Sequence, residues 1–473
     1  MRRAVIPVLA PAEMKAVDAA APEPVEVLVA RAGSAVARAA ERMLGGTYGR
    51  RVVVVAGKGN NGADGRWAAE RLRRRGVGVV VVDAASAPAD LPPCDLVIDA
   101  AYGTGFRGSY VASRPPAGVP VLAVDIPSGV DGLTGEADDG AVRADVTVTF
   151  AALKPGLLLG DGPERCGRVD VVDIGLDTSG ARMHLVEDGD VVARLPRRPR
   201  ASHKWQSAVF VAAGSAGMAG AALLAGRSAL RAGAGYVRLG VPGADPALLP
   251  LGELVGVPLP AEGWAEQALE AAERCRALVV GPGLGRDEAT VADVRAFLAG
   301  ARQPAVVDAD GLAALGDTVA GAGPPALVDA SRLAAVGDAV PGVGRAPRVL
   351  TPHDGEYRRL CGSPPGPDRV AAVRALAART GAVALLKGST TVVAAPDGAV
   401  RFVTSGGPRL ATAGSGDVLS GVVGAFLACG LDALDAASLG AHAHGAAAAL
   451  GCERGLVAAD IVELLPRWLS SNA

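Results

Sequence analysis

The chain has 473 residues, of which 50% are hydrophobic, 20% are charged and 3% are aromatic, and its formal net charge is −2. At about 150 residues per domain, this length predicts two or three domains, each able to bury its own core. The near balance of charges excludes a global field that would favour nucleic acid or a membrane surface, and no apolar run reaches the ~18 residues of a membrane span.

The cysteines and the first residues of the chain bear on its cellular location. Six cysteines lie far apart and form no C-x-x-C pair, which argues against a zinc site or a reactive dithiol. Pro7, Pro11 and Glu13 interrupt the apolar start, which makes a poor secretion signal. We therefore expect a cytoplasmic protein.

The first 195 residues alternate apolar runs with helical stretches. Near-continuous Val and Ile runs are typical of parallel strands that are buried on both faces. A helix is predicted from Ala63 to Arg75, and the pattern indicates a Rossmann-like α/β sandwich of three layers. The predicted strands are Arg51 to Ala56, Val77 to Asp83, Asp95 to Asp99, Val119 to Asp125 and Asp145 to Phe150.

A second α/β series follows a basic, proline-bearing segment near residue 196. We predict a first domain over residues 1–195, a linker over 196–202 and a second domain over 203–473, which ends in a long Ala-rich helical region from Asp417 onward. The predicted strands of the second domain are Ala208 to Ala213, Ala277 to Gly281, Ala305 to Asp308, Arg348 to Thr351, Val383 to Lys387, Thr391 to Ala395 and Val400 to Thr404.

The first glycine-rich turn has two interpretations. The segment from Gly57 to Gly62 matches G-x-G-x-x-G between a strand and a helix, and Asp83 ends the next strand. A dinucleotide-binding dehydrogenase would show this spacing. However, Asn60, Asn61 and a nearby aspartate load the turn with polar side chains, whereas a pyrophosphate turn mainly needs backbone N–H groups. No hydride-transfer site is apparent downstream.

Two further strand ends carry polar motifs. One begins at Asp99 and runs to Gly108, and the other begins at Asp125 and runs to Gly132. In an open parallel sheet such strand ends converge on one crevice. Asn61, Asp99 and Ser128 together offer carbonyl, carboxylate and hydroxyl oxygens, which suit a hard cation. The alternative is that these groups only cap the loops.

The three motifs G-x-G-N-N-G-x-D-G, D-x-x-x-G-T-G-x-x-G and V-D-I-P-S-G-V-D resemble the NAD(P)H-hydrate epimerase family, which interconverts the R and S forms of hydrated NADH and NADPH. One departure is Ala63, where the family usually has a second glycine. The resemblance implies a potassium ion at Asn61, Asp99 and Ser128. It also implies that the hydrated nucleotide contacts Asn60, Asn61, Gly62, Ala63, Asp64, Gly103, Thr104, Gly105, Phe106, Arg107, Gly108, Ser109 and Asp125.

Epimerisation at the hydrated ring carbon requires loss and return of water, or ring opening, with a proton moved on and off. A carboxylate between a cation and buried walls can have its pKa tuned for that work. Asp125 is the candidate catalytic residue. Its alternative role is that of a strand-end cap for the turn at Pro127, Ser128 and Gly129.

In the second domain the sharpest motif is Gly414-Ser-Gly416-Asp417. A Gly-Ser-Gly turn that opens a helix directs several N–H groups at one point, where they can neutralise a transferring phosphoryl group. Asp417 beside it can take the proton from the attacking hydroxyl. The pattern of a Walker loop is absent, and a flexible turn with a helix cap is the alternative.

This arrangement resembles the ribokinase-like kinases. Together with H-K, G-M-x-G-A-A, G-P-G-L-G, T-P-H-x-G-E and K-G-x-x-T, it is closer to the nucleotide-dependent NAD(P)H-hydrate dehydratases, over about residues 200–465. The resemblance implies that the hydrated cofactor contacts Gly283, His353, Asp417 and Ala221 or a neighbour. It implies that the adenine nucleotide contacts Lys387, Gly388, Ser389, Thr390, Thr391, Gly414, Ser415 and Gly416.

Taken together, the two resemblances imply a repair enzyme in which an epimerase domain supplies the isomer that a dehydratase domain uses. Its expected cofactors are K⁺ in the first half and ADP or ATP with Mg²⁺ in the second, and we expect a homo-oligomer that binds no nucleic acid or membrane. The alternatives are a vitamin or sugar kinase with an accessory domain, a catalytically silent nucleotide-binding protein and, more distantly, a dehydrogenase.

Overall fold

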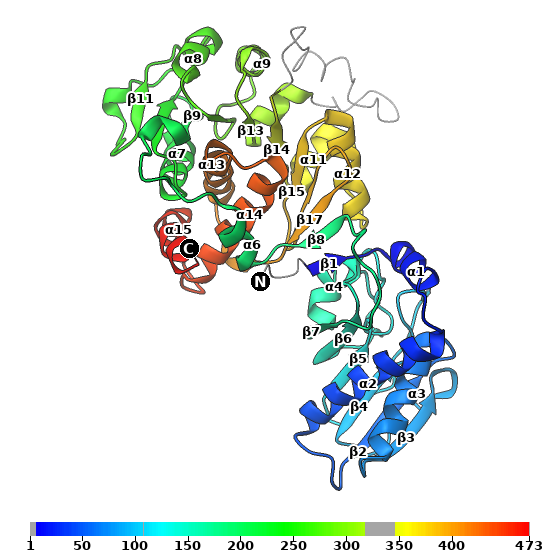
Figure 1. Ribbon diagram of the computed structural model, residues 1–473. Coiled ribbons are helices and arrows are strands. Elements are labelled where there is room, and N and C mark those ends of the chain that lie inside the picture. Colours follow the sequence, from blue (N-terminus) through cyan, green and yellow to red (C-terminus); the bar gives the residue numbers. More distant parts are fainter. Residues whose placement is uncertain (1–5, 107, 317–345, 473) are drawn as a thin grey trace. The chain divides into compact units, whose positions relative to one another are not determined.

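The computed structural model describes residues 6–106, 108–316 and 346–472, which fall into two compact units (Figure 1). The N-terminal unit spans residues 6–184, and the C-terminal unit begins at Leu185. The division lies before the predicted linker, because α6 (Asp188–Arg194) is bound to the C-terminal unit. Arg194 pairs with Asp435 at 2.6 Å, and Asp188 lies 2.7 Å from His442.

A six-stranded, wholly parallel sheet forms the centre of the N-terminal unit, in the order β3-β2-β4-β5-β6-β7. The chain reverses its direction of sheet growth between β2 and β4, which is where an open parallel sheet forms a crevice beyond its carboxyl ends. The strands are β1 (Ile6–Val8), which lies outside this sheet, β2 (Arg51–Ala56), β3 (Gly78–Asp83), β4 (Leu96–Ala100), β5 (Val121–Val124), β6 (Val146–Phe150) and β7 (Arg168–Val172), with β8 (Met183–Leu185) at the division between the units.

Different layers cover the two faces of this sheet. Alternate residues of β2 point to opposite faces, so Val52 and Val54 join a core beneath α2 (Val25–Leu44) and α3 (Asn60–Arg73), whereas Val53 and Val55 join a second core. Connecting segments rather than long helices supply the other side of this second core. The remaining helices of the unit are α1 (Pro11–Ala19), α4 (Pro155–Leu158) and α5 (Gly162–Arg165).

The C-terminal unit is built on a mixed sheet in the order β17-β16-β15-β14-β13-β12-β9-β10-β11. All neighbouring strands from β15 to β11 are parallel. At the β17 edge of the sheet, β16 is antiparallel to both of its neighbours, β15 and β17. The strands are β9 (Ala208–Ala212), β10 (Tyr236–Gly240), β11 (Val255–Val257), β12 (Ala277–Val280), β13 (Ala305–Val307), β14 (Arg348–Leu350), β15 (Val383–Leu386), β16 (Thr391–Ala394) and β17 (Val400–Val403).

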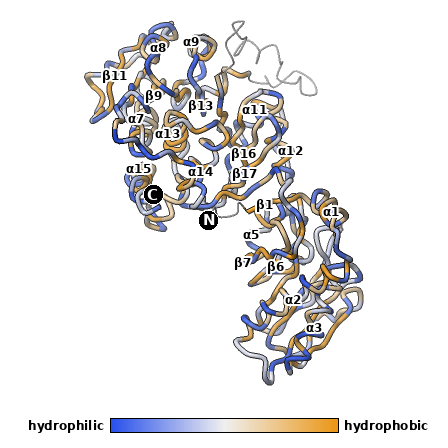
Figure 2. The backbone as a smooth tube through the Cα atoms, in the orientation of Figure 1, coloured by the Kyte–Doolittle hydropathy of each residue, from blue (hydrophilic) through white to orange (hydrophobic). Residues whose placement is uncertain are grey.

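Helices cover both faces of this sheet. On one face α13 (Ser415–Ala428) is hydrophobic along most of its length (Figure 2) and packs between α7 (Ala219–Arg231) and α14 (Ala433–Ala449). Its glycines permit this close packing, because a Cβ at Gly421 would lie 2.1 Å from the Ala225 carbonyl oxygen. The other helices are α8 (Ala265–Ala272), α9 (Glu288–Gly300), α11 (Asp354–Cys361), α12 (Arg369–Thr380) and α15 (Ala458–Ser471).

The predicted fold class is confirmed, and every predicted strand is present. The helix predicted from Ala63 begins three residues earlier, at Asn60, and β7, β10 and β11 lie in regions for which no strand was predicted. None of the described helices combines the length and the hydropathy of a membrane-spanning segment.

Candidate active sites

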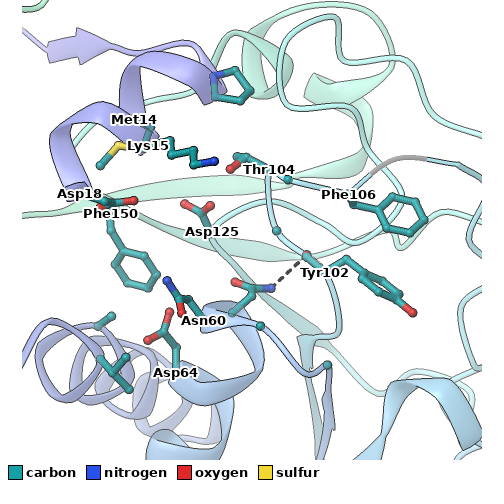
Figure 3. Close-up of a pocket in the computed structure, with 18 of the residues that line it drawn as sticks. Met14, Lys15, Asp18, Asn60, Asp64, Tyr102, Thr104, Phe106, Asp125 and Phe150 are labelled. Atoms are coloured by element: carbon teal, nitrogen blue, oxygen red, sulfur yellow. Dashed lines mark hydrogen bonds between the residues drawn. The ribbon is translucent and has the colours of Figure 1, made fainter. Parts of the chain in front are cut away.

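A cavity of about 980 Å³ opens at the carboxyl ends of the parallel strands of the N-terminal unit. It lies at the β2/β4 reversal, where the fold predicts a ligand crevice. Figure 3 shows its polar side chains converging from α1, α3 and the loops after β4 and β5. Of the predicted residues, those that line it are Asn60, Asn61, Asp64, Gly103, Thr104, Gly105, Phe106 and Asp125.

The turn after β2 folds tightly because two of its glycines approach other backbone atoms closely. A Cβ at Gly57 would lie 1.9 Å from the Ala101 carbonyl oxygen, and one at Gly62 would lie 1.9 Å from the Gly57 carbonyl oxygen. Ala63 lies in the first turns of α3, where alanine is the most favourable residue. Gly62 and Ala63 do not line the cavity, whereas the neighbouring asparagines do.

The loop after β4 enters the cavity only in part. The stretch from Gly103 to Phe106 lines it, while Gly108 and Ser109 are exposed and lie outside it. Arg107 lies outside the described residues. Asp83, the carboxylate of the dehydrogenase interpretation, accepts a hydrogen bond from the Ala85 N–H and caps a short 3₁₀ turn.

Asp125 is held by a buried lysine that the motifs did not indicate. Lys154, which is 1% exposed, donates hydrogen bonds to Asp125 Oδ1 at 2.5 Å, Thr149 Oγ1 at 2.8 Å and the Phe150 carbonyl at 3.2 Å. Thr149 Oγ1 also lies 3.1 Å from Asp125 Oδ1. Both contacts use Oδ1, and none of the described residues forms a hydrogen bond with Oδ2. The second carboxylate oxygen is therefore left for the cavity.

The backbone of Asp125 is constrained as well. Its φ is 68°, in the left-handed region, and the Ile126 N–H bonds to the Val124 carbonyl across it. Such a conformation costs roughly 1–3 kcal/mol in a residue other than glycine and is typical of functional sites. The turn and Lys154 together fix the direction of the carboxylate.

Two further carboxyl groups face the same cavity. Asp64 is 7% exposed, and burial, with the Asp125 and Asp18 carboxylates, raises its pKa to about 8. Burial also raises the pKa of Asp18, against the opposing charge of Lys154. Asp64 forms no ion pair with a described residue. A protonated Asp64 near neutral pH therefore faces an Asp125 that is paired with an ammonium group.

Asn61, Asp99 and Ser128 come together around the backbone of Tyr102. Asn61 and Tyr102 line the main cavity, whereas Asp99 and Ser128 do not. Asn61 Nδ2 donates to the Tyr102 carbonyl at 3.0 Å, and the Tyr102 N–H donates to Ser128 Oγ at 2.9 Å. Ser128 donates its N–H to Asp99 at 2.8 Å and its hydroxyl at 2.7 Å. Asp99 is 2% exposed and has no described cationic partner, and burial raises its pKa to about 6.

In the C-terminal unit the strand ends meet the N-terminus of α13 at Asp308, a residue that the motifs did not indicate. Asp308 is 1% exposed and accepts hydrogen bonds from Lys387 Nζ at 2.6 Å and from Ser420 Oγ at 2.6 Å. Burial alone would lower the pKa of Lys387, but the Asp308 and Glu356 carboxylates outweigh it and raise that pKa. The lysine is therefore a fixed cation beside the first turn of α13.

Asp417 lies in that first turn. Gly414, with φ of 88°, precedes the helix as its N-cap, and a Cβ at Gly416 would lie 3.4 Å from Lys387 Nζ. Free N–H groups at a helix N-terminus attract anions. Burial, reinforced by Asp308, raises the pKa of Asp417 to about 6. The group is thus ionised at neutral pH and can accept a proton.

The remaining predicted residues lie around this centre. Gly283, with φ of 67°, lies against α7, since a Cβ there would be 3.1 Å from Ala221 Cβ. His353 is exposed and caps α11, and its Nε2 lies 3.5 Å from Glu356, whose other oxygen is 4.0 Å from Lys387. Gly388 to Thr390 lie in the turn between β15 and β16, and Thr391 is the first residue of β16. Ser415 Oγ donates to the Leu410 carbonyl at 2.8 Å.

These two centres define a class of protein. One is a carboxyl-lined cavity at the reversal of a parallel sheet, and the other is a carboxylate with a lysine at a helix N-terminus. An α/β enzyme with separate sites for acid–base chemistry and for phosphoryl transfer has this arrangement.

Comparisons with known proteins identify the family. The family model described as NAD(P)H-hydrate dehydratase matches residues 209–467, and the model described as YjeF-related protein N-terminus matches residues 25–90 and 82–156. The bifunctional NAD(P)H-hydrate repair enzyme of Mycobacterium tuberculosis is 41% identical over 83% of this chain and 82% of its own length. The chain therefore belongs to the family of bifunctional NAD(P)H-hydrate repair enzymes.

Solved structures are similar to the C-terminal unit. A ribokinase-like superfamily protein of Enterococcus faecalis has a TM-score of 0.51 and 21% identity, and covers 62% of this chain and 97% of its own. This likeness supports the ribokinase-like fold alone. The ADP/ATP-dependent NAD(P)H-hydrate dehydratase of Bacillus subtilis, co-crystallized with ATP/Mg²⁺, is 29% identical with a TM-score of 0.49, over 61% of this chain and 98% of its own.

Proposed function

We propose that the chain repairs hydrated NADH and NADPH in two steps. The N-terminal unit epimerises the R and S hydrates, and the C-terminal unit dehydrates the S form to NAD(P)H at the expense of ADP or ATP. The observation that carries this function is the pair of separate centres, one on each matched unit. Each has a carboxylate at a strand end or helix N-terminus together with a fixed lysine.

For the dehydratase step, Asp417 takes the proton of the ring hydroxyl as its oxygen attacks the terminal phosphoryl group. The amides of Gly414, Ser415 and Gly416 face the charge that develops, and Lys387 adds a positive charge next to them. The phosphate is a better leaving group than hydroxide, and its elimination restores the nicotinamide ring. Ala221, Gly283 and His353 are proposed to contact the hydrated cofactor, and Lys387 to Thr391 the nucleotide.

Mg²⁺ fits the same centre. The ion commonly binds one or two carboxylates together with substrate phosphates, and the Asp308, Glu356 and Asp417 carboxylates all act on Lys387. The ion would supply charge neutralisation at the phosphates. Asp308 and Asp417 are the proposed contacts, directly or through water.

For the epimerase step, Asp125 is proposed as the acid–base residue, with its free oxygen facing the hydrated carbon. The residues from Asn60 to Asp64 and from Gly103 to Ser109 are proposed to contact the nucleotide. Gly62 and Ala63 would act through the backbone of the turn, because their atoms do not line the cavity.

The donor set around Tyr102 fits a monovalent cation. Asp99 is a buried carboxylate without a described cation beside it, and each carboxylate oxygen has more than one lone pair for contacts. An ion bound to Asn61, Asp99 and Ser128 would supply that missing charge and order the loop after β4. K⁺ is the ion that the family resemblance implies.

We therefore expect epimerisation to depend on K⁺. The exchange of R and S hydrates is measured on a chiral column after exhaustive dialysis, in potassium and in tetramethylammonium buffer. The potassium sample should exchange the hydrates faster and have a higher thermal midpoint. Equal rates and equal midpoints would show that the three residues only hydrogen-bond the loop.

The function itself is tested by incubating the full chain with mixed R and S hydrates, with and without ADP or ATP. NADH should return from both isomers only when a nucleotide is present, and the donor preference follows from the same assay. A stable phosphorylated product without return of NADH would favour the kinase alternative. The cytoplasmic location and the homo-oligomer stay predictions from the sequence.

A further inference from the structure

Among the described residues, Asp64 has no hydrogen-bond or ion-pair partner that would explain why its carboxyl group is buried. Asp64 lies in α3, which α2 crosses closely at Gly33. The absence of a side chain at Gly33 permits this contact, because a Cβ there would lie 2.7 Å from the Asp64 carbonyl oxygen. Asp64 is 7% exposed, and its side chain forms no ion pair or hydrogen bond with a described residue. It nevertheless lines the cavity. A group held in this way is available to the ligand rather than to the fold.

The geometry of the cavity places Asp64 opposite Asp125. Asp64 extends from α3, and Asp125 extends from the loop after β5 on the other side (Figure 3). The environments of the two groups are opposite in kind. Asp125 Oδ1 has an ammonium partner at 2.5 Å, whereas the charged groups that act on Asp64, among the described residues, are the carboxylates of Asp125 and Asp18. Two carboxyl groups in contrasting environments are the usual arrangement for an acid and a base.

We propose that Asp64 is the second catalytic residue of the epimerase, the acid that works on the face of the ring opposite to Asp125. This proposal rests on the proposed function of the N-terminal unit. Protonated Asp64 gives its proton to the leaving hydroxyl as the carbon–oxygen bond breaks. The lone pair of the adjacent ring nitrogen forms a C=N bond, and water departs with the electrons of the broken bond.

The second half of the reaction restores the hydrate with the opposite configuration. A water molecule attacks the carbon from the other face, and its electron pair forms the new carbon–oxygen bond as the C=N electrons return to nitrogen. Asp125 Oδ2 takes the proton that this water loses. One proton has then passed from Asp64 to Asp125, and the reverse reaction, or exchange with water in the cavity, returns it.

The surroundings of Asp64 keep it in the acidic form. The charged residues on the cavity wall besides Asp64 are Lys15 and Asp18 of α1, Lys58 after β2, Asp83 at the end of β3, Asp125 and Lys154. Of these, Asp125 and Asp18 act on Asp64. The part of α2 that packs over it carries Ala32 and Gly33 and no charge. Burial and the carboxylates raise the pKa of Asp64 to about 8, so a proton is available at neutral pH.

The test is the epimerase rate of Asp64→Asn in the full chain, which keeps the shape of the side chain but removes the transferable proton. We expect kcat to fall about 10²–10⁴-fold, with a small change in KM, and the nucleotide-dependent dehydration of the pure S hydrate to stay unchanged. Asp139→Asn is the matched control, because Asp139 is exposed and lies outside the cavity. It should epimerise at the parental rate.

The pH profile gives a second measurement that needs no variant. Epimerisation by the parental chain should fall as pH rises through about 8, because Asp64 then loses its proton, and Asp64→Glu should keep part of the activity with a shifted limb. A parental rate that rises through pH 8, or an Asp64→Asn variant that keeps its kcat with a raised KM, overturns the proposal. Absence of epimerisation in the parental chain would instead overturn the proposed function.

Discussion

Asp417→Asn should lower nucleotide-dependent dehydration of the S hydrate by about 10²–10⁴-fold, the usual contribution of a general base, and leave epimerisation unchanged. The variant keeps the N-terminus of α13 and the Lys387–Asp308 pair but cannot accept the hydroxyl proton. The return of NADH, followed by its absorbance with ADP or ATP present, measures the effect.

The pH dependence separates a base from a residue that only binds. Because the pKa of Asp417 is raised to about 6, dehydration by the parental chain should fall as pH drops below about 6, where the carboxylate becomes protonated. The residual rate of Asp417→Asn should lack this limb. Asp432→Asn is the matched control, an exposed aspartate at the N-terminus of the next helix. Dehydration by Asp417→Asn at the parental rate would contradict the assignment.

The sequence could predict those parts of the fold and the site that depend on residues close together in the chain. The Val-rich strands, the glycine turn after β2 and the Gly-Ser-Gly turn before α13 each follow from neighbouring residues, and so does the position of Asp125 at a strand end. The convergence of the loops after β2, β4 and β5 on one cavity also follows from the rule that the ends of parallel strands lie at the same edge of a sheet.

Residues whose role depends on distant partners could not be found in this way. Lys154 is 29 residues from Asp125, and Lys387 is 79 residues from Asp308, so neither pair forms a motif. One feature of the sequence could have indicated Lys154. It follows the end of β6, as the other site residues follow the ends of their strands. The contact between Arg194 and Asp435, which joins α6 to the C-terminal unit ahead of the predicted linker, cannot be read from neighbouring residues either.

The second large effect concerns the stability of the N-terminal unit. Lys154→Met removes the 1%-exposed ammonium group and leaves the Asp125 carboxylate without its partner. Removal of one member of a buried ion pair costs about 3–5 kcal/mol. The epimerase rate should fall too, because Asp125 Oδ1 is then held by Thr149 alone. Arg38→Met is the control, since Arg38 is exposed, lies outside the cavity and forms no described ion pair.

A second substitution distinguishes the lost charge pair from a simple loss of packing. Asp125→Asn added to Lys154→Met removes the unpaired charge, and asparagine tolerates the left-handed backbone at this position. Hydrogen exchange of the β5 and β6 amides, followed by mass spectrometry, reports the unfolding free energy of this unit. The single variant should exchange about 10²–10⁴-fold faster than the parent, and the double variant should recover most of that loss. A double variant less stable than Lys154→Met would show that the lysine acts through its packing and not through its charge.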